Sequence, residues 1–353
     1  MGQPLSPIER APLAAHCTMG VGGPARFLVE AADEQSVLDA LDWAKRRRLR
    51  LLVLGGGSNL LVSDAGVDAL VLKIALRGVS VTEAQKTVEV TAAAGEPWDD
   101  LVRLTVERDW AGLECLSGIP GLVGATPIQN VGAYGQDVSN TVVSVRVVDT
   151  RTTGVADLPA QQCGFTYRDS VFKSGEPGRY IVLGVRYRLT RDGPPTVAYT
   201  EVARHLETRG VSAPRLRDVR ESVVAIRRSK SMVIERDDPN RRSCGSFFTN
   251  PIVAADDVAA IEACAGESPM PRWPQPDGRV KLSAAWLIER AGFTRGSSDG
   301  AVGLSTRHAL AIVAHDGARA SDVLRFARRV QDAVRARFGV MLTPEPVFWG
   351  FSD

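Results

Sequence analysis

The sequence predicts a protein of mixed helices and strands that folds as two or three domains. Its 353 residues are more than one hydrophobic core usually serves. Alternating apolar residues, as in 70–91, predict short strands, and segments of helical periodicity, as in 34–45, occur among them. Hydrophobic residues make up 44% and charged residues 24% of the chain, which is the balance of an ordinary globular protein.

Charge and cysteine content exclude several classes of function. The net charge of +2, from 43 basic and 41 acidic residues, argues against a general nucleic-acid or membrane-surface binder, so an anionic ligand must be held by a few local cations. The five cysteines are scattered without a CxxC pair, and the histidines do not cluster, so neither a disulfide framework nor a zinc site is expected. We expect no signal peptide and no membrane span, and a reducing cytoplasm as the location.

The N-terminal glycines do not form a dinucleotide fingerprint. Residues 1–16, which contain three prolines, are expected to form a lead-in. Gly20, Gly22 and Ala25 then fit a G-x-G-x-x-A pattern, but the strand candidate at 26–30 follows the glycines. Because a dinucleotide fingerprint follows a strand and opens a helix, we reject a Rossmann site here.

A second glycine cluster stands directly after a predicted strand at 50–54. Gly55, Gly56 and Gly57 would expose bare backbone N–H groups, the kind of concavity that cradles a phosphate. Ser58 and Asn59 add side-chain donors. A plain linker from strand to turn is the alternative.

The segment 117–135 is the most unusual by composition. It follows a predicted helix at 98–110 and contains five glycines and two prolines with almost no charge. A surface linker would be more polar. The composition favours close backbone approach to a large flat ligand such as a flavin or a nucleotide, and a tightly folded core loop is the alternative.

Tyr167 and Arg168 lie between predicted strands at 142–149 and 180–189. A guanidinium matches a carboxylate with two parallel hydrogen bonds, so a buried Arg168 would clamp an anionic ligand. Pairing with Asp169 or another neighbour is the alternative.

The stretch 243–251 combines a tight turn with two aromatic anchors. Gly245 permits the turn, and Phe247 and Phe248 can hold it against a core. Ser246 would then present its hydroxyl at a fixed position, unless the segment is only a buried aromatic turn. The cations at 227–230 are either a solvated helix end or the local charges that a diphosphate needs.

The last third predicts a compact α/β domain. A strand is expected at 309–314 and a tail strand at 340–349. Helices are expected at 201–209, 215–227, 256–264, 282–291 and about 321–338.

Four of these motifs, together with Thr343-Pro344-Glu345, occur in one order that resembles the UDP-N-acetylenolpyruvoylglucosamine reductase family, from about Thr18 to Phe348. They are 55–61, 117–135, 167–170, 245–251 and 343–345. The resemblance implies an α+β fold: a two-part FAD-binding domain of the vanillyl-alcohol-oxidase (PCMH) type and a separate α/β substrate-binding domain. The implied boundaries are 18–195 for the FAD-binding domain, with subdomains 18–75 and 76–195, then 215–335 for the substrate-binding domain and 336–353 for a tail that returns to the FAD-binding domain.

The resemblance also implies roles for individual residues. Arg168 would hold the substrate carboxylate, Ser246 would protonate a substrate carbon, and Glu345 would be the third catalytic group. The implied substrate-binding residues are Tyr167, Tyr199, Lys230 and Asn250, together with Arg295 and His308, which could equally be ordinary surface or core residues. The implied cofactor-binding residues are Gly55, Gly56, Gly57, Ser58, Asn59, Ser117, Gly118, Ile119, Pro120, Gly121, Gly124, Ala125, Asn130, Gly132, Ala133, Tyr134 and Gly135.

Members of this family are NADPH-dependent flavoenzymes with non-covalent FAD. They reduce UDP-N-acetylglucosamine enolpyruvate to UDP-N-acetylmuramate in peptidoglycan synthesis. The resemblance therefore implies that this substrate and NADPH share one cleft, with no metal, nucleic acid, membrane or obligatory protein partner, in a monomer. The alternatives are a flavin oxidase of the same fold and a non-catalytic nucleotide-sugar binding protein. The spacer 231–244, which is rich in arginine and aspartate, departs from the family pattern.

Overall fold

The computed structural model describes residues 5–264 and 269–351. The chain forms two compact units, each made of separate stretches of sequence. The first unit contains residues up to Ala11, Ala25–Gly56 and Asp68–Val233, and the second contains Pro12–Pro24, Gly57–Val67 and the chain from Ile234. Residues 1–4 of the expected lead-in and residues 352–353 of the expected tail lie outside the described residues.

A four-stranded sheet opens the first unit, in the order β1-β2-β5-β3. Its strands are β1 (Ile8–Pro12), β2 (Pro24–Ala31), β5 (Val67–Ile74) and β3 (Arg50–Leu54). Helix α1 (Glu34–Arg46) confirms the helix expected at 34–45. Asp33 caps its N-terminus, with its carboxylate accepting a hydrogen bond from the Ser36 backbone N–H at 2.7 Å. Strand β1 lies in the expected lead-in and was not predicted.

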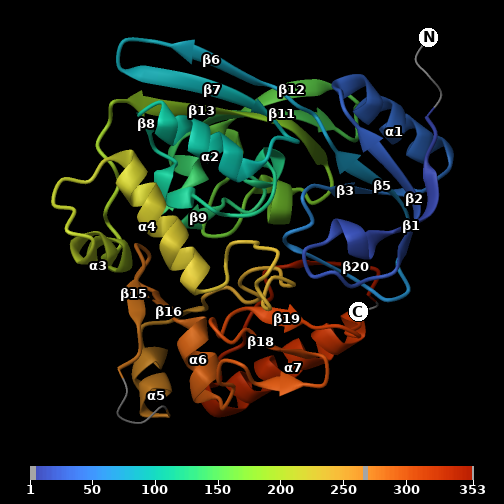
Figure 1. Ribbon diagram of the computed structural model, residues 1–353. Coiled ribbons are helices and arrows are strands. Elements are labelled where there is room, and N and C mark those ends of the chain that lie inside the picture. The colour runs from blue at the N-terminus through green and yellow to red at the C-terminus, as the bar shows by residue number, and fades with distance from the viewer. Residues whose placement is uncertain (1–4, 265–268, 352–353) are drawn as a thin grey trace. The chain divides into compact units, whose positions relative to one another are not determined.

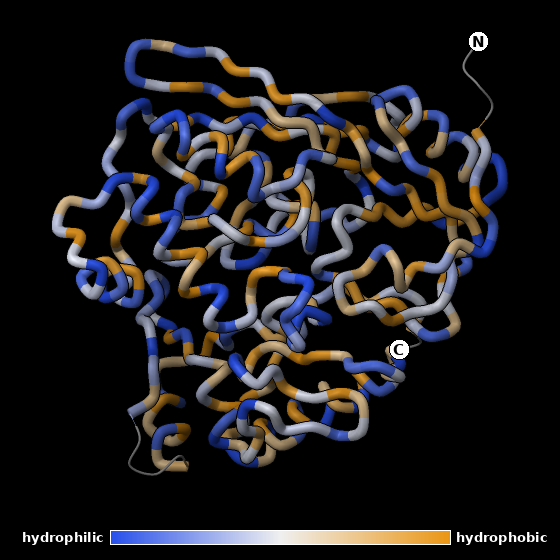
Figure 2. Tube along the Cα trace, in the orientation of Figure 1, coloured by the Kyte–Doolittle hydropathy of each residue, from blue (hydrophilic) through white to orange (hydrophobic). Residues whose placement is uncertain are grey.

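A second sheet forms the rest of the core of this unit, in the order β12-β11-β13-β7-β6, with β8 also paired to β13. The strands are β6 (Val79–Glu83), β7 (Thr87–Ala93), β8 (Trp110–Ala111), β11 (Val142–Asp149), β12 (Val155–Pro159) and β13 (Tyr180–Arg191). At its centre Val185 pairs with Val145 on one side and Ala92 on the other, and all three are buried. Strands β6 and β7 form a long hairpin (Figure 1), in which β6 is exposed throughout and the turn is hydrophilic (Figure 2).

Three helices and a small hairpin complete the first unit. The helices are α2 (Trp98–Glu107), α3 (Thr200–Thr208) and α4 (Leu216–Ser229), and the hairpin strands are β9 (Gly132–Ala133) and β10 (Gln136–Asp137). Val202 and Leu206 of α3 are buried against Val219 and Val223 of α4. The helices expected at 201–209 and 215–227 are therefore confirmed, and α4 packs within the first unit although the expected substrate-binding domain began at 215.

The second unit packs three helices with short strands. The helices are α5 (Asp257–Ala263), α6 (Ala284–Arg290) and α7 (Ala320–Phe338), which confirm the helices expected there. The strands are β4 (Leu60–Val62), β14 (Ile252–Val253), β15 (Arg272–Pro274), β16 (Val280–Leu282), β17 (Ser298–Asp299), β18 (Val302–Leu304), β19 (Ile312–Ala314) and β20 (Val347–Trp349). Strand β20 runs parallel to β4, with Val347 paired to Leu60, and the expected tail strand is confirmed only over these three residues.

The aromatic pair Phe247 and Phe248 lies at the centre of this unit. Their side chains are 0% and 1% exposed, and their rings meet edge to face at 5.3 Å between centroids. Phe326 of α7 and Leu287 of α6 belong to the same core. Over the described ranges, none of the helices has the length and hydrophobicity to cross a bilayer.

Candidate functional site

The expected site residues occur in both units, and each group is built within its own unit. The first unit carries Gly55, Gly56, the loop 117–135, Tyr167, Arg168, Tyr199 and Lys230. The second unit carries Gly57, Ser58, Asn59, Ser246, Asn250, Arg295, His308 and Glu345.

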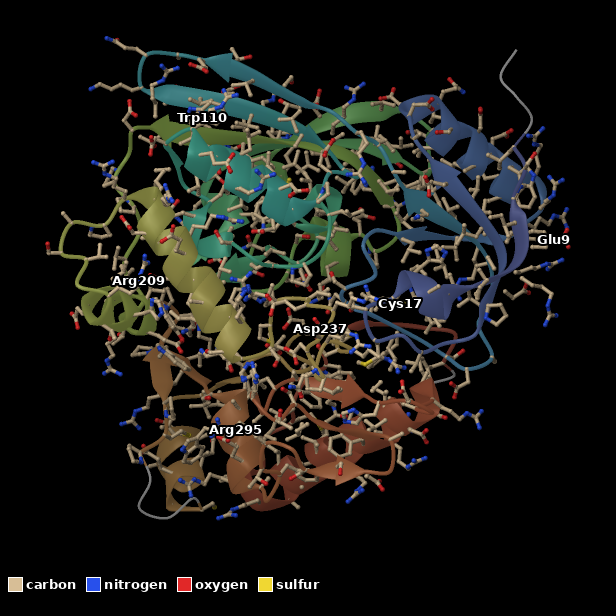
Figure 3. All side chains as sticks on the ribbon, viewed as in Figure 1. Glu9, Cys17, Trp110, Arg209, Asp237 and Arg295 are labelled. Carbon is tan, nitrogen blue, oxygen red and sulfur yellow. The ribbon has the colours of Figure 1, made fainter. Side chains whose placement is uncertain are left out.

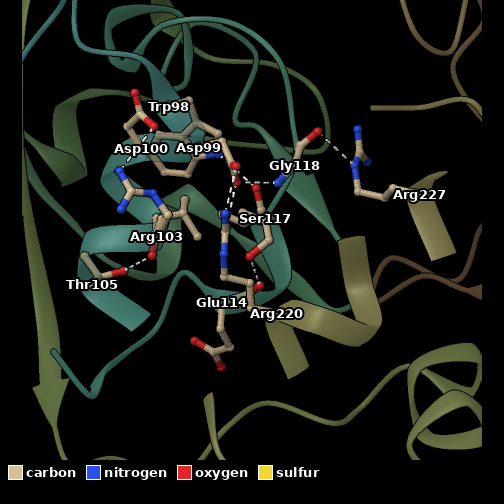
Figure 4. Close-up of polar contacts among 12 residues, drawn as sticks. Trp98, Asp99, Asp100, Arg103, Thr105, Glu114, Ser117, Gly118, Arg220 and Arg227 are labelled. Carbon is tan, nitrogen blue, oxygen red and sulfur yellow. Dashed lines mark hydrogen bonds and ion pairs between the residues drawn. The ribbon is translucent and has the colours of Figure 1, made fainter. Parts of the chain in front are cut away.

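In the first unit, the loop 117–135 is fixed at its start by a carboxylate. Asp99, near the start of α2, accepts a hydrogen bond from the Gly118 backbone N–H at 2.6 Å (Figure 4). The same carboxylate accepts two hydrogen bonds from Arg220 of α4, at 2.7 and 2.8 Å. Burial would raise the pKa of Asp99, but the bonds from Arg220 and Gly118 and the charge of Arg227 hold that pKa below its ordinary value.

A buried arginine holds the same turn from the other side. Arg227 Nε donates to the Gly118 carbonyl at 3.2 Å, and Nη2 donates to the Met232 carbonyl at 2.7 Å. The residue is 8% exposed, and burial lowers the pKa of its guanidinium. Arg227 is therefore not part of a solvated helix end, whereas Arg228 next to it is exposed.

Further along, the loop packs closely on the backbone before α2. The Trp98 N–H donates to the Gly121 carbonyl at 3.0 Å, and the Gly124 N–H donates to the Ala94 carbonyl at 2.9 Å. A Cβ on Gly124 would lie 2.6 Å from the Ala94 Cβ. The expectation of a tightly folded loop is therefore correct for this part, and Ser117 is buried with its hydroxyl donating to the Glu114 carbonyl at 2.6 Å.

The two glycine segments of this unit meet backbone to backbone, which fits a cofactor that needs bare main chain. A Cβ on Gly56 would lie 3.0 Å from the Gly121 Cα. Gly55 has no positive φ, and among the described residues a Cβ there would meet only Leu122 Cδ1, at 4.0 Å. Neither the backbone conformation nor internal packing therefore requires glycine at position 55.

Arg168 reaches back to the same loop. Its own φ is +56°, in the left-handed region. Nη2 donates to the Gly132 carbonyl at 2.5 Å and Nη1 to the Asn130 carbonyl at 3.4 Å, while Asp137 Oδ1 lies 3.7 Å from Nη1. The guanidinium also lies 5.3 Å from the centroid of the Tyr167 ring. The Arg168 side chain is 22% exposed, so it is only partly buried, and Asp137 is an ion-pair partner at 3.7 Å.

Tyr199 and Lys230 lie near the other end of the loop. The Tyr199 ring meets the Tyr134 ring edge to face, with centroids 5.4 Å apart, and burial raises the pKa of Tyr134 to about 12. Lys230 Nζ is 2.6 Å from a carboxylate oxygen of Glu201. Tyr199 is still 39% exposed, so part of its ring faces outward.

In the second unit, the Ser246 segment is a strongly anchored turn. Gly245 has a φ of +72°, which permits the turn, and the Phe247 N–H donates to the Leu310 carbonyl at 2.7 Å. The buried aromatic pair then fixes the backbone on the far side of Ser246. The expected aromatic turn is therefore confirmed, and Ser246 within it is half-buried.

Glu345 lies beside this turn. Its backbone N–H donates to the Phe247 carbonyl at 2.9 Å, and Pro344 forms a bridge with Phe248. The Asn59 side-chain amide donates to the Glu345 carbonyl at 3.2 Å, and the Val347 N–H donates to the Asn59 carbonyl at 3.0 Å. The second unit therefore brings Asn59, the Ser246 turn and Glu345 together.

The three remaining residues are placed differently. Asn250 Oδ1 accepts a hydrogen bond from the Ala284 N–H at 3.0 Å, at the start of α6. His308 lies in the turn that ends at Leu310, which holds Phe247. Arg295, labelled in Figure 3, has a 59% exposed side chain and an ion pair with Glu289 at 3.3 Å.

Three residues that hold the loop 117–135 or contact Arg168 were not assigned by sequence reasoning: Asp99, Asp137 and Arg220. Charged residues in helices and turns are most often exposed, so no specific signal marked them. Within the described residues, no group of three histidine, cysteine, aspartate or glutamate side chains could hold a metal ion.

The bare-backbone loops and the two-sheet first unit define a flavoprotein class. Residues 25–155 match the family model described as an FAD binding domain. Residues 237–349 match the C-terminal domain of UDP-N-acetylenolpyruvoylglucosamine reductase. The two matches together indicate a flavoenzyme with a separate C-terminal domain.

Curated relatives cover nearly the whole chain. The UDP-N-acetylenolpyruvoylglucosamine reductase of Saccharopolyspora erythraea is 47% identical over 352 residues, which is 97% of this chain and 95% of that protein. The reductase of Pseudomonas aeruginosa is 43% identical over 339 residues, 96% of this chain and 97% of that protein. A crystal structure of the Thermus caldophilus reductase is similar with a TM-score of 0.67 at 26% identity, covering 98% of this chain and 99% of that one.

The chain belongs to the UDP-N-acetylenolpyruvoylglucosamine reductase family. It is an oxidoreductase, with FAD as its cofactor and NADPH as its reductant. The expected α+β fold with a two-part FAD-binding domain of the vanillyl-alcohol-oxidase type is confirmed by the FAD-binding match and the Thermus caldophilus structure.

Proposed function

We propose that this chain reduces UDP-N-acetylglucosamine enolpyruvate to UDP-N-acetylmuramate in peptidoglycan synthesis, with NADPH as the source of the hydride. The observation that carries the proposal is the convergence in the second unit, where Asn59, the Ser246 turn and Glu345 are joined by hydrogen bonds although they are far apart in sequence. Family membership supplies the substrate named for the relatives.

The residues proposed to hold FAD without a covalent bond are the bare-backbone segments. They are Gly55, Gly56 and the loop 117–135 in the first unit, and Gly57, Ser58 and Asn59 in the second. FAD, when bound, supplies the relay that takes a hydride from NADPH and passes it to the enol carbon.

Arg168 is proposed to stabilise the negative charge that develops on the substrate carboxylate as the enol carbon is reduced. A fixed charge aimed at developing charge is often the largest single catalytic contribution. The carbonyl contacts of Arg168 hold its guanidinium before substrate binds, which lowers the cost of organising it. Tyr167, whose ring lies beside that guanidinium, would contact the same end of the substrate.

Ser246 is proposed to donate a proton to the second enol carbon. A hydroxyl proton is poorly acidic, so Ser246 must be activated or served by a proton relay. Glu345, whose backbone is bonded to the residue after Ser246, is proposed to assist the carboxylate charge when protonated. The motifs that carry the family resemblance contain no histidine, which fits a proton donor better than a nucleophile.

The remaining substrate contacts are proposed by family resemblance. Tyr199 and Lys230 would contact the UDP-sugar, with Tyr199 reaching over the diphosphate. Asn250, Arg295 and His308 complete the proposed set. The exposed ion pair of Arg295 favours its ordinary surface role, so Arg295 is the weakest member.

We further propose that NADPH and the UDP-sugar use one cleft in turn, in a cytoplasmic monomer. The expected functional boundaries, 18–195, 215–335 and 336–353, are proposed as the FAD-binding domain, the substrate-binding domain and the tail.

A colour experiment separates this function from its rivals. The purified protein should be yellow, should be bleached by NADPH without oxygen, and should recover its colour on adding UDP-N-acetylglucosamine enolpyruvate. Fast recovery with oxygen but not with the enolpyruvyl substrate would indicate a flavin oxidase. A protein that binds UDP-sugars but carries no reducible flavin would be a nucleotide-sugar binding protein.

A further inference from the structure

The side chains of Arg168 and Asp137 lie next to each other beside Gly132. Gly132 and Asp137 belong to the hairpin of β9 and β10. Gly132 pairs with Asp137 in that hairpin. The two residues between the strands, Tyr134 and Gly135, have φ values of +49° and +88°. Two positive φ angles are what a tight two-residue hairpin turn requires. The turn therefore sets Asp137 directly across from Gly132.

The Asp137 carboxylate occupies the space that a side chain at position 132 would need. A Cβ built on Gly132 would lie 1.6 Å from Asp137 Oδ1 and 3.0 Å from Arg168 Nη1. The φ of Gly132 is not in the left-handed region, so its backbone conformation does not demand glycine. The carboxylate and the guanidinium that meet there explain the missing side chain.

Oxygens from one short stretch of chain surround the Arg168 guanidinium. They are the Asn130 carbonyl at 3.4 Å, the Gly132 carbonyl at 2.5 Å and Asp137 Oδ1 at 3.7 Å. The Arg168 side chain is 22% exposed and the Asp137 side chain 50%. An ion pair with this exposure contributes little to stability. The ion pair instead affects orientation, because the Arg168 guanidinium is planar and its hydrogen bonds are directional.

Asp137 is also fixed independently of Arg168. Its backbone N–H donates to Asn140 Oδ1 at 2.9 Å, and the next N–H, of Val138, donates to the Val131 carbonyl at 2.9 Å. The carboxylate therefore projects from a backbone that Arg168 does not hold. The Asn140 contact supports the same turn without touching the guanidinium, which offers a matched control.

We propose that Asp137 is a positioning residue whose carboxylate, seated over Gly132, sets the orientation in which Arg168 presents its guanidinium to the substrate carboxylate. This rests on the role proposed above for Arg168. It also gives Gly132 a second reason to be glycine, since the residue makes room for the carboxylate in addition to any contact with the cofactor.

The test measures the two half-reactions separately in the flavin-loaded enzyme by rapid mixing, together with flavin content. The variants are D137N, R168K, the double variant D137N/R168K, and N140A as the control. We expect D137N to slow reoxidation by UDP-N-acetylglucosamine enolpyruvate about tenfold, because a small misplacement of a catalytic group is costly. Reduction by NADPH and flavin content should stay within twofold of the parent, and N140A should reoxidise at the parental rate.

The double variant tests whether Asp137 acts through Arg168. We expect R168K to slow reoxidation roughly 10²–10³-fold, the scale for removing an electrostatic stabiliser, and the double variant to be no slower than R168K. The positioning role would be overturned if the double variant showed the product of the two single losses in reoxidation rate. It would also be overturned if D137N reoxidised at the parental rate. Loss of flavin or of the NADPH step in D137N would overturn it too, because the carboxylate would then only support the loop. Parental reoxidation in R168K would instead refute the proposed function of Arg168.

Gly132→Ala provides a second, independent variant. Its methyl group would displace the Asp137 carboxylate, so we expect reoxidation per bound flavin to slow about tenfold, as in D137N. Loss of flavin in Gly132→Ala with full reoxidation in D137N would assign Gly132 to the cofactor alone and overturn the inference.

Discussion

The side-chain amide of Asn59 donates a hydrogen bond to the main-chain carbonyl of Glu345, 3.2 Å away and 286 residues further along the chain. A second hydrogen bond runs in the opposite direction, from the Val347 N–H to the Asn59 carbonyl, so Asn59 is bonded twice to the tail segment. A residue expected to bind the cofactor thus also fixes the backbone of an expected catalytic residue. Asn59 therefore serves the placement of Glu345, whatever it contributes to FAD binding.

Replacing Asn59 with alanine should disturb the reaction of the enolpyruvyl substrate. The lost hydrogen bond should lower the free energy of unfolding by about 1 kcal/mol, and the freed Glu345 should slow flavin reoxidation about tenfold per bound flavin. Denaturant unfolding and rapid mixing, corrected for flavin content, measure the two effects.

A control for this variant exists in the same tail. Gln331 of α7 donates to the Leu342 carbonyl at 2.8 Å, three residues before Glu345. Gln331→Ala should cost similar stability and leave reoxidation unchanged. Equal slowing in both variants would show that general loosening of the tail, and not the Asn59 contact, places Glu345.

Ser246→Ala should separate the two half-reactions. We expect reoxidation by UDP-N-acetylglucosamine enolpyruvate to fall by roughly 10²–10⁴-fold, the scale for removing a general acid, while NADPH still bleaches the flavin at the parental rate. Stopped-flow absorbance of the flavin follows both steps. Equal loss of both steps would contradict the role of proton donor.

Gly55→Ala should act on the cofactor and not on the fold. Position 55 has no positive φ and an open Cβ direction. The apoprotein should therefore be as stable as the parent, or more stable by about 0.4–1 kcal/mol, while flavin content after purification falls.

Gly57→Ala is the contrasting variant. Gly57 has a φ of +62°, and a Cβ there would lie 1.9 Å from the His16 carbonyl oxygen. This substitution should destabilise the apoprotein itself. Thermal unfolding of both apoproteins decides the comparison, and an unstable Gly55→Ala apoprotein would argue that position 55 is constrained by folding.

Asp99→Asn should change the response of stability to acid. The folded-state pKa of Asp99 lies below its ordinary value of 3.8. Its carboxylate therefore stabilises the folded protein above about pH 4, and that contribution is lost as the pH falls through the folded-state pKa. Between pH 4 and pH 2 the parent should lose stability more steeply than Asp99→Asn, as measured by unfolding at each pH.

The same variant should loosen the start of the loop 117–135. The carbonyl oxygen of an asparagine at position 99 can accept a hydrogen bond from the Gly118 N–H or from Arg220. Its NH2 group is a donor and would face the other of these two donors. Flavin affinity should fall about fivefold, the equivalent of one ordinary hydrogen bond. Asp100→Asn, with its 63% exposed side chain, is the matched control and should bind flavin normally.

The local features of this chain were predictable because their causes are local. The helix at 34–45 is marked by its apolar spacing and the strand at 142–149 by alternation, and both occur where expected. The turn at Gly245 was also correct, since a glycine followed by two aromatics restricts where the chain can go.

The unpredicted features depend on partners far away in sequence. The strand Ile8–Pro12 forms by pairing with β2 at the edge of the four-stranded sheet. Arg227 follows the helical pattern of an ordinary charged residue, and only the carbonyls of Gly118 and Met232 show that it is buried. Gly132 was assigned to the cofactor, but the carboxylate packed over it lies in the hairpin partner strand.

The pairing of Leu60–Val62 with Val347–Trp349 has a consequence for synthesis of the chain. At about 5–20 residues per second, the ribosome needs on the order of 15–60 s to bring the later strand after the earlier one. All three residues of the earlier strand are buried in the finished unit. Until Val347–Trp349 has been synthesised, the nascent chain carries the apolar strand Leu60–Val62 without its native partner. An unpaired apolar strand can aggregate or bind a chaperone.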